Sequence, residues 1–316
     1  MRAVFEISPP AWGETLAVLQ SVSLADVSSG VRARVVDVAG ERVTVEFPAL
    51  DGETSAEQLL AACVSGEWAD RGDFESCRLV EVEWPEGLPG PAFPAAGGVS
   101  VGAIVKPALG LSAAEAAAVA SELAAGGAVL VKDDELQRCS PERVRAINDA
   151  IPEHVVYAAN VTGVDVEAVV AAGARALMVN AFIAGLGSIG RLREFGLPVF
   201  VHRVGSAFLR RGGAVSVAAG VLAELTQRLG GDYVQVGSFS PRVFDTDEEV
   251  REQIAAARPA TAVIGGGVGP ENAAEQLARA GTRDGVMLLL GSAAYAHPRG
   301  VRAGVAATVE AIADCP

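Results

Sequence analysis

The sequence predicts an α/β protein in two parts: an N-terminal ferredoxin-like α+β domain over residues 1–95 and a C-terminal (β/α)8 TIM barrel over residues 96–316. Three observations support this division. Residues 2–84 follow the order β-α-β-β-α-β, which is that of a ferredoxin-like sandwich. A proline- and glycine-rich stretch, residues 85–98, separates two different patterns. After it, eight strand-like runs each lead into a segment with helical spacing, as in a (β/α)8 barrel.

The N-terminal elements are indicated by alternation and by turn residues. Strands are expected at residues 3–7, 31–38, 43–47 and 77–84. Helices are expected at residues 11–20 and 55–65, the second capped by Ser55. The middle two strands lie on either side of an A-G-E turn that is compatible with a hairpin.

The barrel elements repeat at regular spacing. Strands are expected at residues 101–106, 128–132, 155–160, 174–180, 198–203, 232–236, 261–265 and 285–290. Helices are expected at residues 112–125, 141–150, 164–172, 189–195, 214–229, 247–257, 270–280 and 301–312. A doubly wound open sheet is the alternative, but evenly spaced units favour closure, and no G-x-G-x-x-G follows the first strand.

Composition excludes several classes of partner. The formal net charge is −14 and no run of basic residues occurs, which argues against nucleic acid and anionic membranes. No apolar stretch is long enough to span a bilayer, and no signal peptide opens the chain. Four cysteines without metal-like spacing are expected to be reduced, so the protein is expected in the cytoplasm.

Lysine is almost absent. Only Lys106 and Lys132 occur among 25 basic residues, and all the others are arginine. A lysine retained in an arginine-rich chain indicates a task that arginine cannot perform, such as losing a proton or acting as a nucleophile. Two surface lysines retained by chance are the alternative, but both follow apolar runs.

Polar residues stand at the carboxyl ends of the expected barrel strands, where barrel enzymes place their chemistry. Both lysines and one of the three histidines fall on this rim, and three carboxylates follow Lys132 directly. In chain order the rim residues are Lys106, Lys132 to Glu135, Asn160, Asn180, His202, Arg203, Gln235, Gly265 to Gly267, Gly291 and Ser292.

The acidic cluster Asp133 to Glu135 indicates a cation site, because unpaired like charges are costly where water is partly excluded. A polar loop that opens the next helix is the alternative. Asp134 and Glu135 offer oxygen ligands suited to Mg²⁺. Lys132 as an ammonium would repel the ion, whereas a carbamate formed with carbon dioxide would make it a ligand.

Glycines after the last two strands suit a phosphate, because bare amides can approach its oxygens. We therefore expect phosphate contacts at Gly266, Gly267, Gly291 and Ser292, with tight turns as the alternative. Arg203 could clamp an anion or form a structural ion pair.

Two motifs carry a family resemblance. Val105–Leu111 reads V-K-P-A-L-G-L, and Gly126–Glu135 reads G-G-A-V-L-V-K-D-D-E. Both resemble the large subunit of RuBisCO and its RuBisCO-like relatives. The likeness continues through V-H-R, G-G-D-Y-V-Q-V-G, G-G-G and A-H-P-R-G at residues 201–203, 230–237, 265–267 and 296–300. It covers the whole barrel in order, and the ferredoxin-like domain fits as well.

The resemblance implies a role for each matching residue. Lys132 would be the carbamylated ligand of Mg²⁺, completed by Asp134 and Glu135, while Asp133 would point away from the ion. Lys106 would handle protons next to the bound enediolate. His202 and Arg203 would lie beside the substrate, as would Asn160 and Gln235. The glycines and Ser292 would bind one of its phosphates.

Departures from the family pattern argue against carbon dioxide fixation. The second lysine of K-P-K-L-G-L is Ala108, and the sixth-strand histidine is Gln235. The loop that closes over carbon dioxide with a lysine carries Arg242 instead, and the two are not equivalent. The glutamate that reaches into a neighbouring subunit corresponds to Gln20.

The expected function is that of a Mg²⁺-dependent RuBisCO-like enolase or isomerase, which removes a proton next to a carbonyl of a phosphorylated sugar-derived ketone. One alternative is decarboxylation or hydrolysis of a β-keto sugar-acid phosphate, which passes through the same enolate. Another is a non-catalytic binding descendant. The resemblance also implies a homodimer or larger homo-oligomer, because the family builds its active site between two subunits.

Overall fold

The computed structural model describes residues 1–24, 32–48, 54–65, 67–71 and 73–313. The predicted strand over residues 31–38 begins one residue before the second of these ranges, and Cys315 lies outside them. The remaining cysteines, Cys63, Cys77 and Cys139, are buried free thiols.

The N-terminal unit is an antiparallel sheet covered by helices. Its strands are β1 (Arg2–Ser8), β2 (Arg34–Ala39), β3 (Arg42–Glu46) and β4 (Ser76–Glu83), in the sheet order β4-β1-β3-β2. The helical elements are α1 (Trp12–Leu24), α2 (Ala56–Leu60), a π-helical turn Ala61–Ser65 and a 3₁₀ turn Glu67–Asp70. Alternate residues of β1 are buried, as expected of a sheet with one covered face. The ferredoxin-like prediction is confirmed.

A short strand from the barrel extends this sheet. β10 (Val215–Val217) runs parallel to β4, with Val215 opposite Cys77 and Val217 opposite Leu79. The predicted helix over residues 214–229 is therefore wrong at its start, because the chain forms this strand before α9 (Ala219–Arg228) begins. Helical periodicity cannot reveal the strand, whose backbone hydrogen bonds come from a partner far away in sequence.

Eight parallel strands close the barrel, in the order β5-β6-β7-β8-β9-β11-β12-β13. They are β5 (Val99–Ile104), β6 (Leu130–Lys132), β7 (Val156–Asn160), β8 (Ala176–Val179), β9 (Val199–Val201), β11 (Tyr233–Val236), β12 (Thr261–Gly265) and β13 (Val286–Leu290). All eight fall within the predicted runs or overlap them. Because the sheet is closed, the architecture is a (β/α)8 barrel and not the doubly wound open sheet that the sequence left as the alternative.

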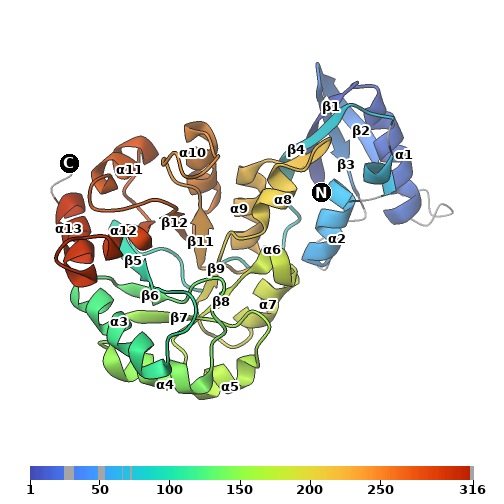
Figure 1. Ribbon diagram of the computed structural model, residues 1–316. Coiled ribbons are helices and arrows are strands. Elements are labelled where there is room, and N and C mark those ends of the chain that lie inside the picture. Colours follow the sequence, from blue (N-terminus) through green and yellow to red (C-terminus); the bar gives the residue numbers. More distant parts are fainter. Residues whose placement is uncertain (25–31, 49–53, 66, 72, 314–316) are drawn as a thin grey trace.

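Helices surround the barrel (Figure 1). Besides α9 they are α3 (Ala113–Ala125), α4 (Pro141–Ala150), α5 (Val166–Ala171), α6 (Ala181–Ala184), α7 (Gly187–Arg193), α8 (Ser206–Arg210), α10 (Asp247–Ala256), α11 (Ala273–Ala280), α12 (Ser292–Tyr295) and α13 (Val301–Ala313). In the part of the chain that the structure describes, no helix has the length and apolarity needed to cross a membrane.

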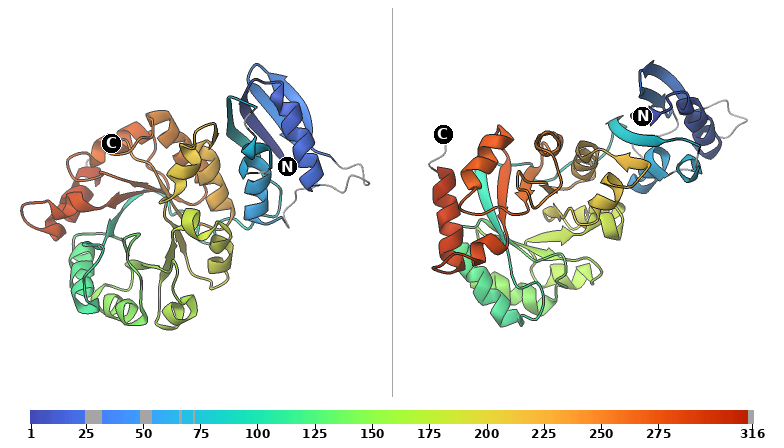
Figure 2. Two further views of the ribbon diagram at one scale, coloured as in Figure 1. Left: turned by 45° about the vertical axis from the view of Figure 1, so that its right-hand side comes forward. Right: turned by 45° about the horizontal axis from the view of Figure 1, so that its top comes forward.

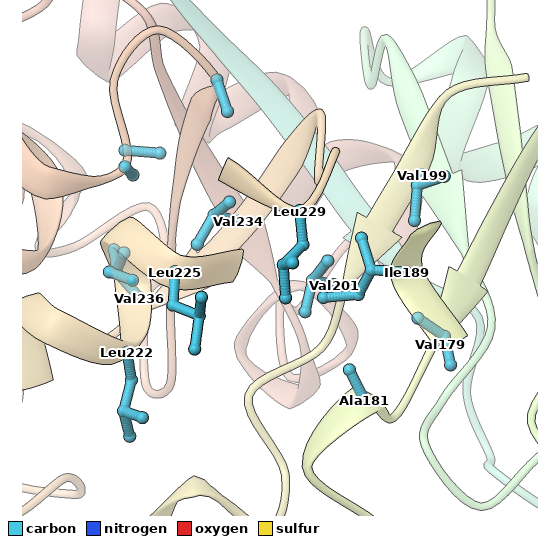
Figure 3. Close-up of a cluster of buried hydrophobic side chains, with 14 of the residues drawn as sticks. Val179, Ala181, Ile189, Val199, Val201, Leu222, Leu225, Leu229, Val234 and Val236 are labelled. Atoms are coloured by element: carbon cyan, nitrogen blue, oxygen red, sulfur yellow. The ribbon is translucent and has the colours of Figure 1, made fainter. Parts of the chain in front are cut away.

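Two hydrophobic cores hold the barrel together. The larger core joins the outer faces of the strands to the helices, and Figure 3 shows part of it, with Leu222 and Leu225 of α9 near Val201, Val234 and Val236. The smaller core gathers residues that face the barrel interior: Leu130, Ala158, Ala176, Met178, Phe200, Val263, Met287 and Leu289. Successive strand residues point to opposite faces. A rim residue two positions after a member of the smaller core therefore faces the barrel interior, and one two positions after a member of the larger core faces the helices.

The N-terminal sheet lies beside the barrel, next to α8 and α9, while α13 lies on the far side (Figures 1 and 2). β10 forms part of this junction. The predicted boundary at residues 95 and 96 falls in the connection between β4 and β5 and stays a prediction.

Candidate active site

Lys132 lies at the centre of the polar layer above the inner core. Leu130 belongs to the inner core, so the next residue on the same face of β6 is Lys132. Its side chain is 0% exposed, and its Nζ lies 5.5 Å from the centre of the Phe200 ring. Nζ donates a 2.6 Å hydrogen bond to the carbonyl oxygen of Asp133. Burial lowers the pKa of Lys132 to about 8, although neighbouring carboxylates oppose the shift.

Asp133 points to the opposite face, as the sequence predicted. Its Oδ1 accepts a 2.9 Å hydrogen bond from Nε of Arg143 on α4. Its Oδ2 accepts bonds from the Tyr157 hydroxyl at 2.7 Å and from the Asn160 backbone N–H at 3.1 Å. This carboxylate is fully buried and held by three donors, so it anchors the strand end and does not face the rim.

Asp134 pairs with the other lysine of the chain. Nζ of Lys106, at the end of β5, donates to Oδ2 of Asp134. Burial alone would raise the pKa of Asp134. The hydrogen bond and charge of Lys106, together with hydrogen bonds from the Leu136 N–H and from Glu135, outweigh burial and hold the pKa below its ordinary value. Lys106 is 34% exposed and therefore reaches solvent at the barrel mouth.

Two asparagines hold the acidic loop in place. Nδ2 of Asn160 donates to the carbonyl oxygens of Asp134 and Glu135, each at 3.1 Å. Nδ2 of Asn180 donates to the Glu135 carbonyl oxygen at 3.0 Å. The Oδ1 of Asn160 accepts from the Thr162 N–H at 3.1 Å. The side chain of Asn160 thus supports the loop, and its predicted contact with substrate stays a prediction.

His202 faces the same layer from β9, two residues after Phe200 of the inner core. Burial, helped by Lys132, Arg203 and Lys106, lowers its pKa well below the ordinary value, so the imidazole is neutral. Nδ1 accepts a 3.1 Å hydrogen bond from the Val204 N–H, which leaves the proton on Nε2. Nε2 lies 3.7 Å from Oε2 of Glu135 and can donate to an oxygen placed in the mouth.

Tyr295 is a site residue that sequence reasoning missed. Its hydroxyl donates to the Ile104 carbonyl at 2.8 Å and accepts from the Lys106 N–H at 2.9 Å. Tyr295 lies on α12, so this contact joins the last barrel unit to the first and fixes the backbone that carries Lys106. A lone tyrosine between small residues offers no sequence signal for such a role.

The glycine loops present free backbone donors. Gly266 and Gly267 have φ angles of 113° and 76°, which favour glycine. The turn and loop hydrogen bonds of the described residues include none that is donated by the backbone N–H of Gly267 or Ser292. A groove of about 780 Å³ is lined by Ser292 and by Arg242 of the loop after β11. Glu271 also lines this groove, whereas Gly266, Gly267 and Gly291 do not. The phosphate contacts expected of these residues therefore stay a prediction.

Three further residues have surroundings that only the structure shows, and for Arg203 these are the ion pair that the sequence left as an alternative. Arg203 forms a 2.9 Å ion pair with Asp245. The Oε1 of Gln235 is buried and has no partner in the described part of the chain. Gln20 is buried inside its own domain, where its amide donates to the Ala62 carbonyl, so it does not extend toward another subunit.

The closed barrel and the polar residues at its mouth are features of a known family of barrel enzymes. Residues 92–258 match the ribulose bisphosphate carboxylase large chain, catalytic domain. The chain belongs to the RuBisCO large-chain family, and within it to the RuBisCO-like proteins.

Two curated relatives illustrate the range of the family. The chain is 30% identical to 3-oxo-isoapionate-4-phosphate decarboxylase of Rhizobium rhizogenes, over 100% of this chain and 82% of the relative. It is also 30% identical to 2,3-diketo-5-methylthiopentyl-1-phosphate enolase of Microcystis aeruginosa, over 67% of this chain and 60% of that enzyme.

Solved structures share the fold. The octameric ribulose-1,5-bisphosphate carboxylase/oxygenase of Pyrococcus horikoshii superposes with a TM-score of 0.86 at 24% identity, covering 99% of this chain and 87% of that one. A RuBisCO-like protein from Burkholderia fungorum gives a TM-score of 0.84 at 22% identity, covering 99% and 93%.

Asparagine substitutions separate the roles of the two adjacent aspartates. Asp133→Asn leaves the buried Arg143 guanidinium without its anion, and we expect a loss of about 3–5 kcal/mol in the free energy of unfolding. Asp134→Asn removes only the partner of a lysine that reaches solvent, so about 1 kcal/mol or less is expected. Urea unfolding in the presence of EDTA measures both variants. Equal losses would contradict the structural role of Asp133.

Proposed function

We propose that this chain is a Mg²⁺-dependent enzyme that forms an enolate on a phosphorylated, sugar-derived keto compound, and that the reaction is decarboxylation of a β-keto sugar-acid phosphate. The convergence of both lysines, two carboxylates and a neutral histidine at one barrel mouth carries the proposal. The name of the Rhizobium rhizogenes relative supports the reaction class.

Lys132, Asp134 and Glu135 would hold the metal ion. Among the described residues, no group of three or more His, Cys, Asp or Glu side chains could bind a metal. Two carboxylates beside a buried lysine are nevertheless a fitting set, because a pKa of about 8 leaves part of the amine uncharged near neutral pH. An uncharged amine adds carbon dioxide and releases a proton, which gives a third anionic ligand. When bound, Mg²⁺ supplies stabilisation of the negative charge on the enolate oxygen.

Lys106 supports decarboxylation over proton abstraction. As the donor to Asp134 it is an ammonium group, which is an acid. Loss of carbon dioxide from a β-keto acid leaves an electron pair on the enolate, and Lys106 Nζ–H can deliver the proton to carbon. Solvent then restores the proton, since Lys106 is partly exposed. His202 Nε2–H can donate to the ketone oxygen as charge develops there.

Enolisation is the second candidate, as the sequence first indicated. It uses the same residues, with Lys106 acting as a base after losing its proton to solvent. Similarity to the Microcystis aeruginosa enolase supports it. In both reactions we propose that Gly266, Gly267, Gly291 and Ser292 bind the phosphate through backbone N–H groups.

A homo-oligomer completes the proposal. The N-terminal sheet lies beside its own barrel (Figure 2). Exposed apolar side chains follow four of the barrel strands. Leu109, Leu136, Ile183 and Phe208 follow the carboxyl ends of β5, β6, β8 and β9 and are between 60% and 80% exposed. A second copy that covers this apolar rim would remove it from water.

Light scattering tests the oligomer. We expect a mass at least twice 32.2 kDa. Phe208→Asp places a charge on the apolar rim and should shift the mass toward the monomer. Val129→Asp is the matched control, because Val129 is also exposed but precedes β6 at the opposite end of the barrel. A monomeric wild type would contradict the proposal.

Thermal unfolding tests the lysine carbamate. We expect Mg²⁺ with bicarbonate at about 100-fold over the Kd to stabilise the wild type by about 2.7 kcal/mol, which raises the Tm by roughly 5 °C. Lys132→Met should abolish the response. Lys106→Met is the matched control, because it removes the other lysine and leaves the metal ligands in place. No response in either the wild type or Lys132→Met would favour the non-catalytic binding protein, and an equal stabilisation of both would contradict the carbamate.

Product analysis tests the reaction. With 3-oxo-isoapionate 4-phosphate in D₂O we expect one bicarbonate per turnover and one deuterium at the carbon that lost carbon dioxide. Lys106→Met should lower kcat by about 10²–10⁴-fold, as for loss of a general acid. Deuterium exchange into a diketo phosphate without release of carbon dioxide would instead establish the enolase.

A further inference from the structure

Arg203 and Arg210 share one internal anion. Nη2 of Arg203 lies 2.9 Å from Oδ2 of Asp245, and Nη2 of Arg210 donates to Oδ1 of the same carboxylate. Nε2 of Gln253 donates to Oδ1 at 3.0 Å. The Asp245 side chain is 0% exposed and that of Arg210 is 3% exposed. The carboxylate of Asp245 thus occupies the position that an anionic ligand of these arginines would take.

This cluster lies off the layer that carries the lysines. Phe200 and His202 face the barrel interior, whereas Val201 packs in the outer core, so Arg203 continues the outer face of β9. Asp245 lies in the loop between β11 and α10, and its carboxylate meets Arg203 on the outer face of β9. The ion pairs of Asp245 with Arg203 and Arg210 therefore hold the loop after β11 against β9 and α8.

The remaining space is too small for a phosphate. The cavity bounded by Arg203, Arg210, Gln235 and Gln253 measures about 20 Å³, which is room for about one water molecule. Nη1 of Arg203, Nε and Nη1 of Arg210 and Oε1 of Gln235 have no partner within the described ranges. One water that accepts from a guanidinium and donates to Gln235 would satisfy several of these atoms.

The surroundings of Asp245 favour its charged form. Burial raises the pKa of this carboxyl group, but Arg203, Arg210 and Gln253 together outweigh burial and hold the pKa below its ordinary value. A substrate anion would have to displace a buried, hydrogen-bonded carboxylate, which weakens its binding on the order of a hundredfold or more.

We propose that Asp245 is a built-in anion that fills the arginine site, so that the substrate carries a single phosphate, bound at the glycine loops. The inference deepens the proposed function and rests on its phosphate subsite. It makes Arg203 a support of the loop after β11 and not a ligand of the substrate. It also predicts that a second phosphate group on a sugar adds little or no affinity.

Calorimetric titration with inorganic phosphate in EDTA counts the anion sites of the full chain. We expect one phosphate per wild-type chain and two per chain of Asp245→Ala, in which both arginines become free. The double variant Arg203→Met/Asp245→Ala should return to one. Asp245→Ser also removes the carboxylate and most of the side-chain volume, and it serves if the alanine variant does not fold, with the second site again expected.

Competing outcomes are distinguishable. Two phosphates on the wild type, or only one on folded Asp245→Ala and Asp245→Ser, would overturn the inference while the phosphate subsite of the proposed function survives. No saturable binding to the wild type would overturn that subsite and this inference with it. In a second titration, ribulose 1,5-bisphosphate should bind wild type within about threefold of ribulose 5-phosphate; a tenfold preference for the bisphosphate would also contradict the inference.

Discussion

The complete burial of Lys132 is the constraint on which the active site depends. An amine at the end of β6, above the Phe200 ring, is removed from water on every side. Burial disfavours its charged form, while three neighbouring carboxylates and the Asp133 carbonyl oxygen favour it. The balance holds the pKa near the range in which the amine can gain or lose a proton. A surface lysine would have no comparable reactivity toward carbon dioxide.

The surroundings of Lys132 depend on barrel closure. The acidic loop is held from β7 by Asn160, from β8 by Asn180 and from α4 by Arg143 through Asp133. Tyr295 joins α12 to the end of β5 and so fixes the backbone of Lys106. Each of these contacts is modest alone, but together they leave the loop and both lysines little freedom to reorganise. Such preorganisation is what stabilisation of a developing charge requires.

Charge is distributed differently at the two sides of the mouth. On the inner face, Lys106 and Lys132 meet carboxylates that a cation could share. On the outer face of β9, two arginines are already neutralised in part by Asp245. The proposed metal ion would meet the carboxylates of the inner face, and the proposed single phosphate would meet the glycine loops.

The sequence by itself determined the two-part organisation, the barrel strands and most of the residues at the rim. It could do so because alternation and helical spacing are local, and because the carboxyl ends of parallel strands must meet at one face. The family resemblance also implied that Asp133 points away from the proposed metal ion. The family motifs added the expected role of each rim residue.

Only the tertiary structure decided which partner each side chain takes. β10 was hidden inside a helical pattern because its hydrogen bonds come from β4, more than a hundred residues away. Tyr295, Arg210 and Asp245 gave no motif, since their contacts join elements distant in sequence. Arg203 could have been an anion clamp or an ion pair, and the packing of the loop after β11 made it the second. Long-range packing and charge pairing form only when the chain is closed into a barrel, so local patterns cannot contain them.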